Sequence, residues 1–206
     1  SYMGANVLHP ESIFPVRKAN IPIHILNTFN PEAEGTKIVP TELFLKGEYE
    51  RKNKRPITAI AGKKHFFSMY IDKSMMNAEI GFVRRVLKCF EQLNIPIEHI
   101  PSGIDSMTVV FSAVDKEIAD TLIETVKNEV HPDHISLSTD VALIAIVGHG
   151  MVSRPGTAAR AISRLSNAGI NLRMIDQGAS EINIILGVSD DDFERALIAL
   201  NGEFEV

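Results

Sequence analysis

Two glycines 75 positions apart, Gly81 and Gly156, each stand beside a predicted amphipathic helix. The first N–H groups of a helix have no intrahelical partner and lie at the positive end of the helix dipole, so they can hold a carboxylate. A glycine at such a turn also lets a ligand approach the backbone. The turns at 74–81 and 148–156 are therefore candidate anion sites, although a lone glycine more often only ends a turn.

The two turns differ in the charged residues around them. The first turn has Glu79, Glu98 and Asp105, and the positions 75 residues later hold Arg154, Arg173 and Ser180. The first turn thus offers carboxylates where the second offers guanidinium groups or a hydroxyl. A ligand with a carboxylate and a distant ammonium group matches the first turn. Taken singly, each acidic residue is more typical of a solvated surface.

Other reactive residue types lack a supporting pattern. Pro132 breaks the turn that His131 and His134 would share, and no third ligand completes a tetrahedral metal site. Neither a Gly-x-x-x-x-Gly-Lys-Ser/Thr loop nor a Gly-x-Gly-x-x-Gly turn occurs. The single Cys89 lies in an apolar helical pattern and indicates a buried hydrophobe. The residues predict neither a catalytic nor a metal site.

Strands and helices alternate from residue 57 onward. Predicted strands lie at 57–61, 65–71, 95–100, 107–113 and 135–138. Apolar residues at helical spacing are Ile80, Val83, Leu87 and Phe90 in the first helix, and Ile118, Leu122, Val126 and Val130 in the second, which Asp115 is expected to cap. From residue 65 onward the order is β-α-β-β-α-β, and the strand at 57–61 precedes this unit as an additional strand.

The pattern then restarts with an offset of 75 residues and no gap. Residues 93–100 fall on 168–175, and 108–111 fall on 183–186. A β-α-β-β-α-β unit forms a four-stranded antiparallel sheet with two helices on one face. After the last helix, predicted at 192–200, little chain remains for a final strand, so the strand at 57–62 is expected to complete copy two. The sequence predicts two four-stranded sheets, with copy one inserted into copy two.

Composition restricts the class of protein. The 206 residues carry a net charge of −5, with 45% hydrophobic residues. Residues 1–64 hold 10 Lys plus Arg against 6 Asp plus Glu, and residues 65–206 hold 11 against 20, which gives +4 and −9. The acidic part would repel a phosphate backbone, so we expect no nucleic-acid partner. No apolar run reaches the roughly 18 to 20 residues of a membrane span, so we expect no membrane association and a cytoplasmic location.

Several motifs together resemble one family. They are Val7-Leu8-His9-Pro10, the turn at 27–31 with Gly35-Thr36, the run Gly156 to Arg160 and the run Ser180 to Ile184. In these motifs, and in its paired copies, the sequence is similar to aspartate kinases over nearly its whole length. The resemblance implies an α+β fold with two ferredoxin-like ACT domains. It places a remnant of the kinase domain at 1–40, a linker at 41–56, ACT domain 1 at 65–139, and ACT domain 2 at 57–62 plus 140–206.

The resemblance also implies a function. The chain would be the allosteric regulatory region of a lysine-sensitive aspartate kinase, a homodimer that binds L-lysine as feedback inhibitor at an interface between ACT modules, with L-threonine open as a second effector. The matching effector positions are Met76, Glu79, Gly81, Phe82, Val83, Ile97, Glu98, Asp105 and Ser106. Asn6 and Val7 match the nucleotide edge of the kinase domain, where the family often has Lys in place of Asn6.

The phosphate-binding segments of the family are missing, so the resemblance implies a fragment without catalytic residues or kinase activity. It needs no cofactor itself, and ATP and Mg²⁺ serve the full-length enzyme. Two alternatives stay open. One is a free-standing ACT sensor subunit of another biosynthetic enzyme, against which the kinase-like residues 1–38 argue. The other is an RNA-binding module of the same topology, with Phe66, Phe67 and Phe111 as stacking residues, although copy two has Ala142 and Leu186 at the places of Phe67 and Phe111.

Overall fold

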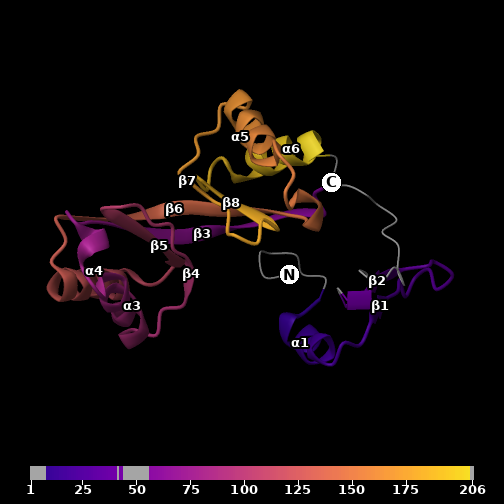
Figure 1. The fold of residues 1–206 in the computed structure, drawn as a ribbon, viewed down its shortest axis with the longest axis horizontal. Coiled ribbons are helices and arrows are strands. Elements are labelled where there is room, and N and C mark those ends of the chain that lie inside the picture. Colours follow the sequence, from indigo (N-terminus) through magenta and orange to yellow (C-terminus); the bar gives the residue numbers. More distant parts are fainter. Residues whose placement is uncertain (1–7, 41, 44–55, 205–206) are drawn as a thin grey trace. The chain divides into compact units, whose positions relative to one another are not determined.

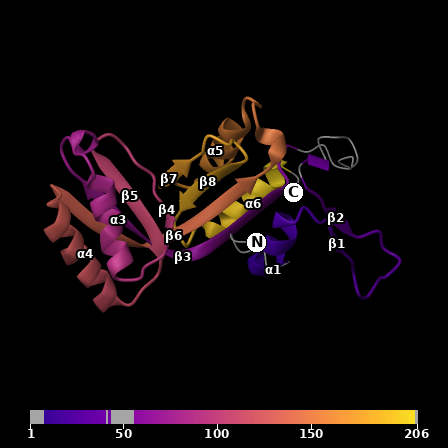
Figure 2. The same cartoon turned by 60° about the horizontal axis from the view of Figure 1, so that its bottom comes forward.

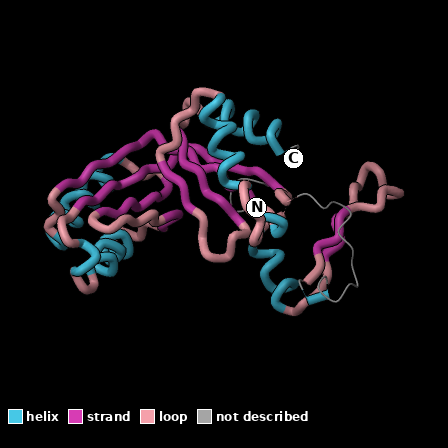
Figure 3. Tube along the Cα trace, turned by 45° about the horizontal axis from the view of Figure 1, so that its top comes forward, coloured by secondary structure: helices cyan, strands magenta, loops and turns pink. Residues whose placement is uncertain are grey.

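The computed structural model describes residues 8–40, 42–43 and 56–204. The chain forms two compact units, Ser1–Pro56 and Ile57–Val206, and each is described by itself. Figures 1 and 3 show their helices and strands. Asn6, Val7 and nearly all of the predicted linker lie outside the described residues.

The described part of the first unit contains one helix and one pair of short strands. Helix α1 (Pro10–Lys18) has a proline at its first position, where the missing N–H is not needed. Strands β1 (Ile23–Ile25) and β2 (Thr36–Ile38) form an antiparallel pair. At Gly35, where φ is 67°, a side chain would collide with the carbonyl oxygen of Ile25. No described residue of this unit is buried, so its described part has no core of its own.

The second unit contains one six-stranded antiparallel sheet in the order β4-β5-β3-β6-β8-β7. Its strands are β3 (Ala59–Asp72), β4 (Ile97–His99), β5 (Ser106–Ser112), β6 (His134–Val147), β7 (Met174–Asp176) and β8 (Asn183–Val188). Its helices are α3 (Phe82–Gln92), α4 (Lys116–Val130), α5 (Thr157–Asn167) and α6 (Phe193–Phe204), with short 3-10 turns η1 (Met76–Ala78) and η2 (His149–Met151). No helix in the described part of the chain has the length and apolar character to cross a bilayer.

The two copies share their central strands. Residues 59–63 of β3 pair with 143–147 of β6, whereas residues 66–72 pair with both β5 and the first half of β6. The strand before copy one therefore completes the sheet of copy two, and the predicted insertion is confirmed. The expectation of two separate sheets is wrong. The strands predicted at 57–61 and 65–71 are one long strand, β3, with a bulge between Lys63 and Ser68, and β6 likewise runs through both copies.

The helices are buried along faces that the sequence only partly indicated. In α3 the buried residues are Phe82, Val86, Cys89 and Phe90, and in α4 they are Ala119, Leu122, Val126 and Val130. Burial of Cys89 confirms the interpretation from the sequence. Ile80 and Val83 are exposed instead of buried, and Gly81 with φ 79° is the N-cap, so the helix starts at Phe82, two residues after Ile80. Asp115 stands at the start of α4, but its side chain makes no capping hydrogen bond.

Each copy has its own core beneath its own pair of helices. Further buried residues, Phe66, Val110, Val141, Leu143 and Ala145, belong to neither core and lie on the strand face that the helices leave free. His99 on edge strand β4 also lies 3.3 Å from Asp176 on edge strand β7, at the other end of the strand order. The sheet therefore curls until its edges approach, with the two helix pairs on its outer side (Figures 1 and 2).

Candidate functional site

The turn between β3 and α3 is held by two aspartates. The backbone N–H of Ser74 donates to Oδ2 of Asp133 over 2.7 Å, and that of Met75 donates to Oδ1 of Asp105 over 3.0 Å. The hydrogen bond from Ser74 holds the pKa of Asp133 below its usual range. Asp105, a predicted effector residue, thus ties this turn to the loop between β4 and β5.

Glu79 is occupied within its own chain. Its carboxylate lies 3.2 Å from Nζ of Lys73 and forms an ion pair with Arg85. Both cations are about three-quarters buried. A ligand's ammonium would have to compete with two cations for this carboxylate, so Glu79 shapes the turn. Sequence reasoning missed Lys73 and Arg85, because neither stands at a periodic position relative to Glu79.

The start of α3 combines a rigid floor with free donors. Phe82 and Met76 are 2% and 5% exposed and belong to the core of copy one. The N–H of Phe82 donates to the carbonyl oxygen of Glu79 over 3.1 Å. The N–H of Arg85 donates to the carbonyl oxygen of Gly81 over 3.0 Å, whereas those of Val83 and Arg84 have no acceptor one turn earlier. Val83 and Arg84 therefore supply the two N–H groups that remain for an anion.

Glu98 lies at the opposite end of strand β5 from this turn. It accepts a hydrogen bond from Oγ of Ser112 over 3.3 Å, whereas Ser106 pairs with Asp72 at the end of β3. The six residue steps from Ser106 to Ser112 span about 20 Å of strand. The structure thus divides the predicted effector residues into two groups. Met76, Glu79, Gly81, Phe82, Val83, Asp105 and Ser106 form one group, and Ile97 and Glu98 form the other.

Exposed apolar side chains surround the start of α3, which sequence reasoning did not foresee. Ile80 is 96% exposed and Ile104 is 71% exposed, and Met75, Val83 and Ile100 are exposed as well. The hydrogen bond between Met75 and Asp105 keeps the two loops that carry them together. We call these five residues the apolar rim. Such a group is typical of a surface that binds another molecule.

The corresponding turn of copy two is open. A hollow of about 600 Å³ lies between residues 151–158 and 177–181. The 75-residue offset places Thr157 and Ala158 where copy one has Phe82 and Val83. The sequence pointed to the turn at 148–156, but it did not show that this turn leaves room beside it.

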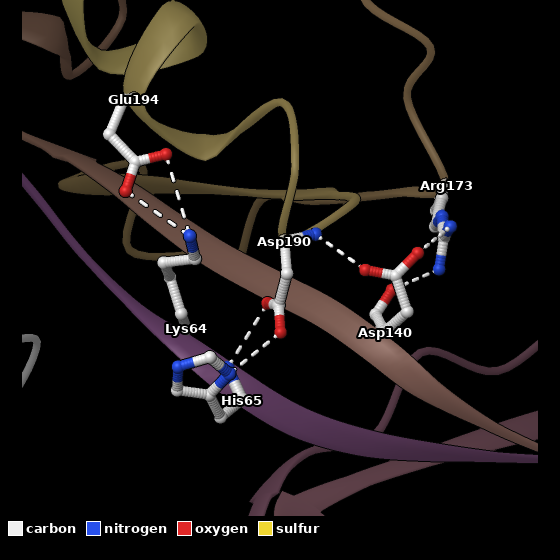
Figure 4. A network of polar contacts seen from close by, with 6 residues as sticks. All are labelled: Lys64, His65, Asp140, Arg173, Asp190 and Glu194. Carbon is white, nitrogen blue, oxygen red and sulfur yellow. Dashed lines mark hydrogen bonds and ion pairs between the residues drawn. The ribbon is translucent and has the colours of Figure 1, made fainter.

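A polar network lies where the bulges of β3 and β6 meet (Figure 4). Arg173, the counterpart of Glu98, donates to Oδ2 of Asp140 over 2.7 Å, and the N–H of Asp190 donates to Oδ1 of Asp140 over 2.7 Å. The hydrogen bond from the N–H of Asp190 is the main cause that holds the pKa of Asp140 below its usual range, and the bond from Arg173 lowers this pKa further. Asp190 also accepts from the backbone of His65, and Lys64 pairs with Glu194 over 3.2 Å. The bonds of His65 with Asp190, and of Arg173 with Oγ of Ser138 over 3.3 Å, therefore join the two copies.

Metal-ligating side chains do not cluster in the part of the chain that the structure describes, where no group of three His, Cys, Asp or Glu residues is suited to hold an ion. The predicted nucleotide-edge residues Asn6 and Val7 lie outside that part.

Comparisons with known proteins place these elements in a family. Residues 144–204 match the ACT domain model. Aspartokinase 3 of Bacillus subtilis is 39% identical over 206 residues, which cover 99% of this chain and 44% of that protein. The crystal structure of Clostridium acetobutylicum aspartate kinase is 42% identical, with a TM-score of 0.87 over 98% of this chain and 46% of that one. Escherichia coli aspartokinase III in complex with lysine and aspartate is 22% identical and shows the same fold, with a TM-score of 0.74.

The chain spans less than half the length of the aspartokinases described above. Within that span the similarity reaches both compact units, because it covers 98% or more of the chain. Together with two interlocked β-α-β-β-α-β copies, these findings show that the chain is similar to aspartokinases over nearly its whole length and folds as a tandem of ACT domains.

Proposed function

We propose that the chain is the allosteric regulatory region of an aspartate kinase, and that it senses L-lysine between the first ACT domains of two chains. The observation that carries the proposal is the division of the effector residues into two complementary groups. The start of α3 offers backbone donors for a carboxylate, but Glu79 and Asp105 beside it are already occupied. Glu98 keeps carboxylate capacity beyond its bond with Ser112, and it lies at the far end of β5.

A two-fold axis between two chains would bring the two groups of effector residues together. If the axis passes near residues 100–102, midway between the groups, the helix start of each chain faces the partner subunit's Glu98. Strand β4 is an edge strand that Ile100 of the apolar rim follows directly, and the rest of the rim surrounds the start of α3. An isologous contact of this kind buries the rim and closes the exposed edge. The resulting homodimer has two equivalent lysine sites.

The chemistry of each site follows from its two halves. The α-carboxylate of lysine accepts hydrogen bonds from the N–H groups that begin at Val83, assisted by the helix dipole. The side-chain ammonium donates to the partner subunit's Glu98 in a charge-assisted hydrogen bond. Met76 and Phe82 form the floor, and Glu79 and Asp105 hold the turn in place. Escherichia coli aspartokinase III, whose structure is in complex with lysine and aspartate, has the same fold.

Catalysis belongs to a longer enzyme in this proposal. That enzyme would transfer a phosphoryl group from ATP, with Mg²⁺, to L-aspartate, and lysine would inhibit it from the ACT region. The 206-residue chain itself is expected to show no kinase activity above background. L-threonine stays open as a second effector of the same region.

The RNA-binding alternative finds no support in the fold. Phe66 and Phe111 are 2% and 0% exposed, and Phe67 is half-buried, so these rings offer no stacking surface. No observation favours the alternative of a free-standing sensor subunit, because the similarity to aspartokinases continues through both compact units.

Calorimetric titration of the 206-residue chain with L-lysine tests the proposal. Glu98→Gln keeps the shape and deletes the charge, so we expect lysine affinity to fall about ten-fold or more. Glu91→Gln, the same change at an exposed position of α3, is the matched control and should leave the affinity unchanged. Absence of lysine binding, or equal effects of the two variants, would contradict the proposal.

Mixed dimers test whether the site joins two chains. Val83→Pro removes one backbone donor at a position where a helix tolerates proline. Each of the variants Glu98→Gln and Val83→Pro should bind lysine weakly alone. Their equimolar mixture should regain about one quarter of the wild-type capacity, since half of the dimers are mixed and each has one intact site. No recovery would place the site within one chain.

A further inference from the structure

The hollow of copy two is built differently from the lysine site and calls for a different ligand. It lies at the start of α5, between residues 151–158 and 177–181, and its volume of about 600 Å³ falls within the range of small-molecule sites. Small residues make the room. At Gly156 and Gly178, no heavy atom lies within 4 Å of the place that a Cβ would take.

Thr157 supplies an independent sign of a ligand. It is 8% exposed and lines the hollow, and it is the one buried polar residue in the described part of the chain. Its hydroxyl makes no hydrogen bond with any described residue. The hydroxyl oxygen is not one of the fully buried polar atoms without a partner, so it reaches the surface of the hollow, where a polar group of a ligand can bond to it.

The charged groups of the hollow specify the ligand further. Arg154 lines it, and its guanidinium has no ion pair among the described residues. Glu181 lines it too, and one of its oxygens accepts the backbone N–H of Ser153 over 2.6 Å, which leaves capacity for a second donor. The first turn of α5 adds backbone donors at Ala158. The hollow therefore offers two places for anions and one for a cation.

We propose that this hollow binds an α-amino acid with an acidic side chain. One carboxylate accepts from the first turn of α5 and from Thr157, the second pairs with Arg154, and the ammonium group donates to Glu181. Arg154 stands where copy one has Glu79, so the second ACT domain takes an anionic side chain and the first a cationic one. This site is separate from the proposed lysine site, because the two share no residue.

Equilibrium dialysis of the 206-residue chain with L-aspartate and L-glutamate tests the inference. We expect saturable binding of at least one of them, with one site per chain. L-Asparagine, which lacks the second negative charge, and succinate, which lacks the ammonium group, should each bind at least ten-fold more weakly than L-aspartate if aspartate is the better ligand. Saturable binding of neither acid, or equal binding of asparagine, would overturn the inference.

Variants locate the site. Arg154→Gln should weaken binding of the acidic amino acid ten-fold or more, and Thr157→Val several-fold, whereas Thr157→Ser should retain it. Lys116→Gln is the matched control, since Lys116 is an exposed cation in the first turn of α4. Circular dichroism of the same preparations verifies that each variant is folded. If Arg154→Gln and Lys116→Gln weaken binding equally, the effect is one of net charge and the assignment is wrong.

Discussion

The starts of α3 and α5 occupy equivalent places in two copies of one fold, yet their surroundings differ in kind. At α3 the turn is filled by Phe82 and an occupied Glu79, and the apolar rim surrounds it. At α5 the same positions hold Thr157 and Arg154 beside an open hollow. The duplicated backbone therefore repeats the helix start with its free N–H groups. The different side chains led us to propose a contact between chains at the first copy and a ligand site within the second.

The largest expected effect concerns the filled turn. Phe82→Ala removes a ring that is 2% exposed and should lower the free energy of unfolding by about 3 to 5 kcal/mol. Thr157→Ala at the equivalent position removes a smaller side chain beside a hollow and should lower it by about 1 kcal/mol or less. Urea unfolding of both variants measures the difference. Equal losses would show that the two turns are packed alike.

The apolar rim provides the next test. Ile104→Glu places a charge on the surface that we expect to be buried between two chains, so the dimer dissociation constant should rise ten-fold or more. Ala179→Glu, at the equivalent place in copy two, should leave it unchanged. Sedimentation equilibrium distinguishes the two variants. A monomeric wild-type chain at tens of micromolar would refute the dimer outright.

A smaller effect is expected at the charges beside the two helix starts. Glu79→Gln leaves Lys73 and Arg85 without their carboxylate and should lower the free energy of unfolding by about 1 to 2 kcal/mol. Arg154→Gln breaks no ion pair among the described residues and should change it by less than about 0.5 kcal/mol. Thermal unfolding at fixed pH compares them. A larger loss for Arg154→Gln would reverse the proposed roles of the two residues.

The smallest effect concerns pH at the junction of the two copies. The pKa of Asp140 is lowered in the folded chain, chiefly by the N–H of Asp190 and then by Arg173. A lowered folded pKa contributes stability above the unfolded pKa, and this stability is lost as pH falls through the folded pKa. Asp140→Asn should therefore make stability less dependent on pH in the acidic range. An unchanged pH profile between neutral pH and the onset of acid unfolding would show that the network contributes little.

Sequence periodicity predicted most of the backbone but not the exact faces of its helices. The offset of 75 residues predicted two β-α-β-β-α-β copies, and the short C-terminal end predicted that residues 57–62 complete copy two. The apolar face predicted for the first helix began with Ile80 and Val83, whereas the structure exposes both and buries Phe82 and Val86. The left-handed conformation of Gly81 separates Ile80 from the helix, which the periodicity did not show.

The sequence by itself determined the repeat, its insertion, the burial of Cys89 and the resemblance to aspartokinases, because these depend on local pattern and on motifs. Tertiary structure alone decided that long strands join the copies into one sheet, that Glu98 lies at the other end of about 20 Å of strand β5 from Ser106, and that Lys73 and Arg85 pair with Glu79. It also opened the hollow beside Thr157. Distances across a sheet and the space between loops depend on pairings between residues far apart in the chain, which a linear pattern does not specify.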